Sequence, residues 1–189
     1  MIFQLESLKL VLFSIDLLCL YILLIGVTWS ILVPKKRIWP PPKKTSWQYY
    51  LTWVLFCIVF LLNFLLVLLD WNSWIFTESI RFFIAFPLII WGGMLFSWGI
   101  ITLGTKNTSG IKDQFIKKGP YRYTRNPQYL GDNILFFGII ILSNSLFSLI
   151  THALLILVFL ITPWAEESWL EEQYNEIYKE YKKEIPRFI

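Results

Sequence analysis

A long apolar stretch, YLGDNILFFGIIILSNSLFSLITHALLILVFLITPW, runs from residue 129 to residue 164. A helix needs about 20 mostly apolar residues to cross a membrane, so this stretch is too long for one crossing and just long enough for two. The triplet Ser143-Asn144-Ser145 lies near its middle, and these residue types favour turns and caps. We therefore predict a tight hairpin of two membrane helices, at residues 129–143 and 145–164.

Three more apolar stretches precede the hairpin, at about residues 8–33, 49–69 and 80–103. The composition agrees with this, because 56% of the 189 residues are hydrophobic and 16% are charged, whereas soluble domains carry about 25% charged residues. These proportions exclude a soluble globular protein and a disordered chain. We expect an all-α integral membrane protein with five transmembrane helices, and the length suits one domain over residues 1–189.

The charges of the connecting loops alternate along the chain. Residues 34–47 carry five basic residues and no acid, and residues 70–79 carry two acids and no base. Residues 104–128 carry six basic residues and one acid. Basic residues collect in cytoplasmic loops of membrane proteins. We therefore place the first and third loops in the cytoplasm, which puts the N-terminus outside and the C-terminus inside.

The residues after the hairpin predict an amphipathic helix over about 166–184. Acidic residues fill its first turns and lysines its last, as the helix dipole favours. Its apolar residues recur at helical spacing and form one stripe, at Leu170, Tyr174, Ile177, Tyr178, Tyr181 and Ile185. We expect this helix to lie against the cytoplasmic membrane face, where it could cover a site.

Two short polar motifs flank the hairpin. Before it, Asn126 is a good helix N-cap and Pro127 fits the first helical position, so free backbone N–H groups form an anion site beside Arg125. After it, Glu166 and Glu167 return to the same depth, where paired carboxylates need solvent or partners. Together the motifs could hold a zwitterionic or cationic cofactor. The arginine and the helix end would take its carboxylate, and the glutamates an ammonium or ribose hydroxyls.

Each motif also has a simpler interpretation. Arg125 and Asn126 could be a positive-inside arginine and a helix cap, and this motif alone does not decide between the two interpretations. Glu166 and Glu167 could be the acids that open the next helix. Asp132 is a further functional candidate, because acids inside a membrane usually have a role, but solvation near the start of the helix would also explain it.

Residues 115–189 carry several motifs in order: Gly119-Pro120-Tyr121, Arg125-Asn126-Pro127-Gln128-Tyr129-Leu130-Gly131, Glu166-Glu167, Tyr178-Lys179-Glu180-Tyr181 and Ile185-Pro186. This pattern resembles that of the isoprenylcysteine carboxyl methyltransferase and phospholipid N-methyltransferase superfamily of integral membrane methyltransferases. Asn126 stands where that superfamily has histidine, and asparagine cannot act as a base that titrates near neutral pH. Asn175 stands where many members have glycine, and asparagine tolerates left-handed backbone.

The resemblance implies a membrane-embedded methyltransferase that uses S-adenosylmethionine as the methyl donor, bound between the hairpin helices and the C-terminal segment. The implied cofactor site consists of Tyr121, Arg125, Asn126, Pro127, Tyr129, Leu130, Gly131, Glu166 and Glu167, with Arg125 and Glu167 as catalytic residues. The acceptor would be lipid-like or prenylated, would come from the bilayer, and would offer a carboxylate, an amine or a thiol. We expect no metal, no nucleic acid and no protein partner.

Two other functions remain open. Tyr129-Leu130-Gly131-Asp132 is similar to a stretch of the sterol reductases, so a membrane oxidoreductase that uses NADPH is the first alternative. Those enzymes are much longer, and no phosphate-binding cluster for NADPH is evident in this chain. A non-enzymatic membrane scaffold is the second alternative, and only the composition supports it.

Overall fold

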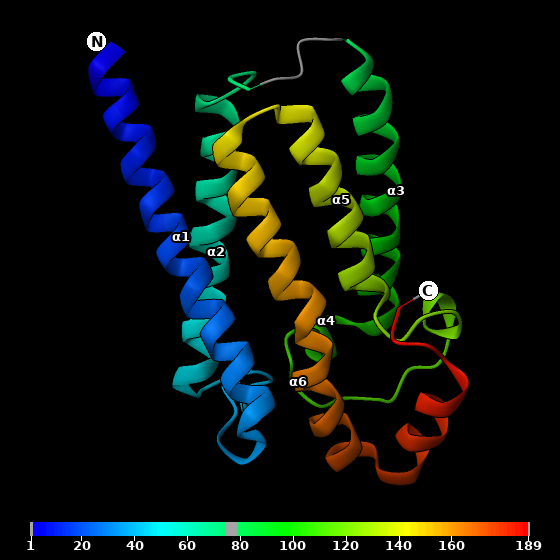
Figure 1. The fold of residues 1–189 in the computed structure, drawn as a ribbon. Coiled ribbons are helices and arrows are strands. Elements are labelled where there is room, and N and C mark those ends of the chain that lie inside the picture. Colours follow the sequence, from blue (N-terminus) through cyan, green and yellow to red (C-terminus); the bar gives the residue numbers. More distant parts are fainter. Residues whose placement is uncertain (1, 75–78, 189) are drawn as a thin grey trace.

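The apolar segments form helices that lie side by side in a computed structural model of the chain, which describes residues 2–74 and 79–188 (Figure 1). Within those residues there is no strand, so the prediction of an all-α protein is confirmed. The long helices are α1 (Ile2–Leu32), α2 (Trp47–Leu69), α3 (Ile80–Leu103), α5 (Pro127–Ser143) and α6 (Leu146–Glu184). The short elements are α4 (Thr105–Thr108) and the 3-10 turns Pro34–Lys36 and Gly119–Arg122.

Among the described residues, α1, α2, α3 and α6 are the four helices long and apolar enough to cross a membrane. By length and composition, the chain is a multi-pass membrane protein. α5 has 17 residues, about 25 Å at 1.5 Å per residue, which is less than the roughly 30 Å of a hydrocarbon core. The crossing by α5, and hence the count of five, stays a prediction.

The hairpin is present where the sequence predicts it. α5 ends at Ser143 and α6 begins at Leu146, and Asn144 between them has a φ of 46°. This is the left-handed region that asparagine tolerates. Ser145 caps α6 by accepting a hydrogen bond of 3.0 Å from the Ser148 N–H. The turn is therefore made by the residue types that predicted it.

Glycines bring α3 and α5 into close contact. A Cβ atom at Gly92 would lie 2.5 Å from the Leu135 backbone nitrogen, and one at Gly131 would lie 2.8 Å from the Gly92 carbonyl oxygen. These distances leave no room for a larger residue, so the two helix backbones touch, as small residues permit in membranes. Gly93 differs, because a Cβ there would meet only a methyl group of Leu135, at 3.7 Å.

The remaining helices pack around α6. Its buried Leu155 and Val158 belong to a hydrophobic core that α1, α2 and α5 complete. A polar chain crosses this core, since Asn63 of α2 donates to Asp16 of α1 at 2.8 Å and accepts from Thr151 of α6 at 2.7 Å. Polar residues in the middle of the helices thus find partners on neighbouring helices.

The loops alternate between the two ends of the helix bundle, as the charge pattern requires (Figure 1). Residues 34–46 and 104–126 lie at one end, together with the end of α6. Residues 70–74 and the turn at Asn144 lie at the other end with the N-terminus. Glu78, one of the two acids assigned to the second loop, lies outside the described residues. The membrane face that each end occupies stays a prediction.

The end of the chain differs from its prediction. We predicted a membrane helix that ends at residue 164 and a second helix over 166–184, but α6 continues through both without a break at that point. No glycine lies near Trp164 to end the helix, and the glutamates that follow favour helix. The interruption falls at Asn175, whose φ of 51° and ψ of −129° are not helical. The chain then turns back, and residues 185–188, here called the C-terminal segment, follow (Figure 1).

Candidate functional site

The two adjacent glutamates of α6 face different partners. Successive residues of an α-helix point about 100° apart, since one turn holds 3.6 residues. Glu166 contacts α5 and the loop after α1, whereas Glu167 contacts the loop before α5 and the C-terminal segment. The predicted pair of carboxylates thus belongs to two separate sets of contacts.

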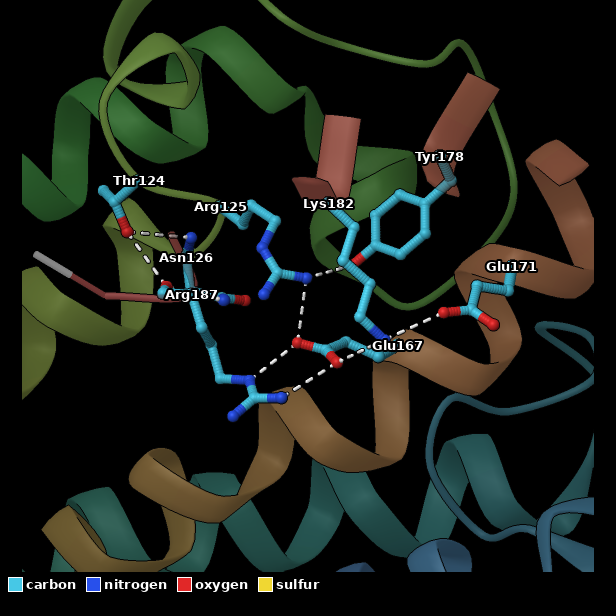
Figure 2. Close-up of polar contacts among 8 residues, drawn as sticks. All are labelled: Thr124, Arg125, Asn126, Glu167, Glu171, Tyr178, Lys182 and Arg187. Carbon is cyan, nitrogen blue, oxygen red and sulfur yellow. Dashed lines mark hydrogen bonds and ion pairs between the residues drawn. The ribbon is translucent and has the colours of Figure 1, made fainter. Parts of the chain in front are cut away.

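Glu167 lies at the centre of a cluster of cations (Figure 2). Its carboxylate lies 2.9 Å from Arg125 Nη1 and 3.1 Å from Lys182 Nζ, and it accepts hydrogen bonds of 2.6 and 2.9 Å from Arg187. Lys182 also contacts Glu171 at 2.9 Å. The side chains of Arg125 and Glu167 are only 7% and 9% exposed. Three cations and two carboxylates leave this cluster with one net positive charge, which suits the carboxylate group of a ligand.

The C-terminal segment is tied to the loop that precedes α5. The Thr124 hydroxyl and the Asn126 amide donate to the Arg187 carbonyl oxygen at 3.0 and 2.9 Å (Figure 2). Asn126 occupies the N-cap position as predicted, but its side chain makes no capping bond to α5. Its amide donates to the Arg187 carbonyl oxygen instead, so the first turn of α5 receives no cap from Asn126.

A cavity of about 90 Å³, here called the polar cavity, lies beside this cluster. The predicted residues that line it are Tyr121, Arg125, Asn126, Tyr129 and Glu166. Four aromatic residues complete the wall of this cavity, and none of them was among the predicted site residues. Phe115 packs against Tyr174, Tyr178 and Tyr181, with ring centroids 5.0, 6.1 and 5.5 Å away. Burial raises the pKa of the Tyr121 phenol well above its usual value, so this hydroxyl stays protonated.

A larger cavity of about 360 Å³, here called the apolar cavity, adjoins the polar one. Helices α1, α2, α3, α5 and α6 all contribute to its mostly hydrophobic walls. Thr108, Gln128 and Tyr129 line both cavities. Ile25 and Phe60 line the apolar cavity and are also exposed on the outside of the bundle. The apolar cavity therefore borders the surface that would face lipid.

Tyr129 and Glu166 lie where the two cavities meet. The Tyr129 hydroxyl donates to Glu166 Oε1 at 2.5 Å, and the Trp39 indole N–H donates to the same oxygen at 2.7 Å. Trp39 is buried, although it belongs to the loop between α1 and α2. No sequence signal assigned Trp39 to the site, because 127 residues separate it from Glu166.

Four predicted site residues line neither cavity: Pro127, Leu130, Gly131 and Glu167. Pro127 begins α5, and Gly131 packs against α3. Glu167 does not reach the polar cavity, but it pairs with Arg125, which lines that cavity. Asp132, the further candidate, lines the apolar cavity.

Metal ligands do not gather in the described part of the chain, where no group of three or more His, Cys, Asp or Glu side chains could hold an ion. His152, the single histidine of the sequence, is buried, and its Nδ1 lies 2.9 Å from the Ser148 carbonyl oxygen of its own helix. This contact gives His152 a packing role within α6.

Comparison with known proteins gives a family match. A family model described as phospholipid methyltransferase matches residues 80–177, more than half of the chain, from the start of α3 to just past Asn175. No curated protein and no solved structure gives a significant match. The matched residues include Arg125, both glutamates of α6 and most walls of the polar cavity.

Proposed function

This chain belongs to the phospholipid methyltransferase family, and from that membership we propose that it transfers the methyl group of S-adenosylmethionine to a lipid-like acceptor at the cytoplasmic membrane face. The observation that supports this best is the pair of adjoining cavities, one polar and one apolar, which share Thr108, Gln128 and Tyr129. A water-soluble donor and a lipid acceptor each need a matching environment, and their reacting atoms must meet. On this proposal residues 1–189 form one methyltransferase domain.

The residues around the polar cavity fit the donor. When bound, S-adenosylmethionine supplies a methyl group that is already activated on a positively charged sulfur. Arg125 would hold its carboxylate, because the Arg125 Nε is buried and makes no hydrogen bond within the described residues. Phe115 and Tyr174 offer rings for stacking on the adenine, and Glu166 offers an acceptor to the ammonium or to ribose hydroxyls.

Donor binding requires the polar cavity to widen. At about 90 Å³, it is smaller than the roughly 300–1,000 Å³ of most ligand pockets. Polar contacts rather than helix packing hold the C-terminal segment: hydrogen bonds from Thr124 and Asn126, and the pair between Arg187 and Glu167. We infer that this segment opens to admit the donor and closes again to exclude water.

The apolar cavity suits the acceptor. Its hydrophobic walls can bury an acyl or prenyl chain, and Ile25 and Phe60 mark a route from the bilayer. The polar end of the acceptor would then lie near Tyr129, at the wall shared with the donor cavity. There the protein orients the two reactants and excludes water, and a displacement on an activated methyl group needs little more.

The basic loops support a cytoplasmic site. Residues 34–46 and 104–126 are the loops rich in lysine and arginine, and they lie at the same end of the bundle. The polar cavity is also at this end, because residues of the loop 104–126 line it. The positive-inside rule assigns that end to the cytoplasm. With α5 as a fifth crossing, the N-terminus would lie outside and the C-terminus inside.

Calorimetry of the detergent-solubilised protein tests the proposal, with S-adenosylhomocysteine and NADPH as separate ligands. We expect saturable binding of S-adenosylhomocysteine and none of NADPH. Binding of NADPH alone would favour the oxidoreductase alternative. If protein shown to be helical by circular dichroism binds neither ligand, both enzyme functions fail and the scaffold alternative stands.

A further inference from the structure

Asp132 differs from the other buried acids that the structure describes. Asp16 and Asp70 accept side-chain hydrogen bonds, and Glu167 is surrounded by cations. Within the described residues no hydrogen bond or ion pair involves the Asp132 carboxyl. This side chain lines the apolar cavity from α5, and the residue is only 9% exposed.

A second polar atom of the same cavity also lacks a partner. Trp53 of α2 lines the apolar cavity, and its indole N–H is buried without a hydrogen bond to any described residue. Buried polar groups are normally hydrogen-bonded. An acceptor and a donor left unpaired in one mostly hydrophobic cavity therefore indicate a ligand whose polar end would pair with both.

Asp132 lies close to the junction of the two cavities. Tyr129 and Asp132 are three residues apart on α5 and therefore share a face of that helix. Tyr129 lines both cavities and donates to Glu166. A group bound by Asp132 would thus lie within one helical turn of the wall shared with the polar cavity.

We propose that Asp132 determines which acceptor is methylated, by binding the amine of a lipid and excluding a carboxylate. The inference rests on the methyltransferase function proposed above. In a poorly solvated cavity, a carboxylate attracts an N–H donor and repels a second carboxylate. Trp53 can donate to an oxygen of the same headgroup, which fixes its orientation.

The transfer balances around the amine nitrogen. The lipid amine first releases to water the proton that it carries at neutral pH. The neutral amine then gives its lone pair to the methyl carbon as the carbon–sulfur bond of the donor breaks, and the electron pair of that bond stays on sulfur. The nitrogen is then a methylated ammonium with a proton to lose. Asp132 accepts a hydrogen bond from the amine N–H before transfer and takes that proton afterwards. The products are a methylated amine and a neutral thioether.

The test compares Asp132→Asn with Asp16→Asn, a matched control in which the altered acid is also buried in a membrane helix but lines neither cavity. Radiolabelled S-adenosylmethionine is supplied with vesicles of dioleoylphosphatidylethanolamine or with N-acetyl-S-farnesylcysteine, which offers a carboxylate. For the amine lipid, we expect Asp132→Asn to lose at least about tenfold in kcat/KM and Asp16→Asn to stay within about threefold of the native protein. Asp132→Asn should bind S-adenosylhomocysteine as tightly as the native protein does.

Three results would overturn the assignment and leave the donor site intact. They are native-like amine methylation by Asp132→Asn, a native protein that methylates only the carboxylate, and a native protein that binds S-adenosylhomocysteine but methylates neither acceptor. A native protein that does not bind S-adenosylhomocysteine would overturn the proposed function itself, and the assignment of Asp132 with it.

Trp53→Phe keeps the inference testable where Asp132→Asn does not fold. This variant should raise the KM for the amine lipid about threefold or more, because one headgroup hydrogen bond is lost. Its affinity for S-adenosylhomocysteine should not change. A KM equal to that of the native protein counts against a headgroup in this cavity.

Discussion

Glu166 and Glu167 are neighbours in the sequence, yet Glu166 accepts hydrogen bonds from Tyr129 and Trp39 while Glu167 pairs with Arg125 at 2.9 Å. Because the two carboxylates point in different directions from the helix, they have different roles. Glu166 forms part of the wall where the cavities meet, and Glu167 fixes the arginine that faces the polar cavity. Substitutions at these two positions should therefore cause different defects.

Arg125→Ala should lower the affinity for S-adenosylhomocysteine at least about tenfold, because it removes the cation assigned to the ligand's carboxylate. Glu167→Ala should have a similar effect, since Arg125 then loses its buried partner. Calorimetry measures the affinity, and size-exclusion chromatography shows whether each variant stays monodisperse. Lys179→Ala is the control, because Lys179 forms an exposed pair with Glu176. Unchanged affinity in both variants would remove these residues from the site.

Tyr129→Phe and Trp39→Phe each remove one hydrogen bond to the same oxygen of Glu166. We expect each to reduce kcat/KM for methyl transfer by about three- to tenfold, because the other donor remains. The double variant should lose more than the product of the two effects, since Glu166 then keeps neither donor. Rates for all four proteins give the coupling, and Trp47→Phe, at an exposed tryptophan, is the control. Strictly additive effects would mean that the two donors act independently.

Gly131→Ala should destabilise the protein by about 1–3 kcal/mol, because the new methyl group overlaps the backbone of α3. Gly93→Ala is the matched control, since its methyl group would meet only a side-chain methyl of Leu135, at 3.7 Å. Thermal unfolding in detergent, followed by circular dichroism, should show a lower midpoint for Gly131→Ala alone. Equal midpoints for the two variants would contradict close packing of α3 on α5.

Single cysteines test the membrane topology. A reagent that cannot cross membranes should label Ser73→Cys on intact cells, and label Thr45→Cys and Lys183→Cys only after the membrane is opened. Four crossings separate residues 45 and 183 when α5 spans the membrane, but three when it does not. Labelling of Lys183→Cys but not of Thr45→Cys on intact cells would therefore exclude five crossings. The native Cys19 and Cys57 lie within α1 and α2, so the unsubstituted chain is the control.

The sequence predicts the helices well because their signal is local. The length of the apolar stretch at residues 129–164 and the turn-forming triplet within it suffice to predict the hairpin. The sequence carries no comparable local signal that α6 continues past residue 164. A change from apolar to acidic residues marks the end of a hydrophobic surface, but it does not end a helix, and no glycine lies near Trp164 to do so.

The site is predictable where the hairpin sets its geometry. The turn at Asn144 lies at a similar distance along the chain from Arg125 and from Glu167, so the hairpin brings these two residues back together, and that contact is present. Contacts with residues outside the hairpin depend on tertiary packing, so the positions of Trp39 and Phe115 could not be predicted. Asn126 shows a third case, because its amide prefers a tertiary partner, the Arg187 carbonyl, to the local cap that its position predicts.

As a fifth membrane crossing, the short helix α5 would affect the lipids as well as the protein. Its 17 residues leave it roughly 5 Å shorter than a typical hydrocarbon core, and a helix that is too short cannot correct the difference by tilting. If α5 crosses the membrane as predicted, the bilayer would become thinner beside it, which would draw neighbouring headgroups inward toward Tyr129. The elasticity of the membrane would thus perform part of the work of delivering a substrate, and thin bilayers should suit this protein better than thick ones.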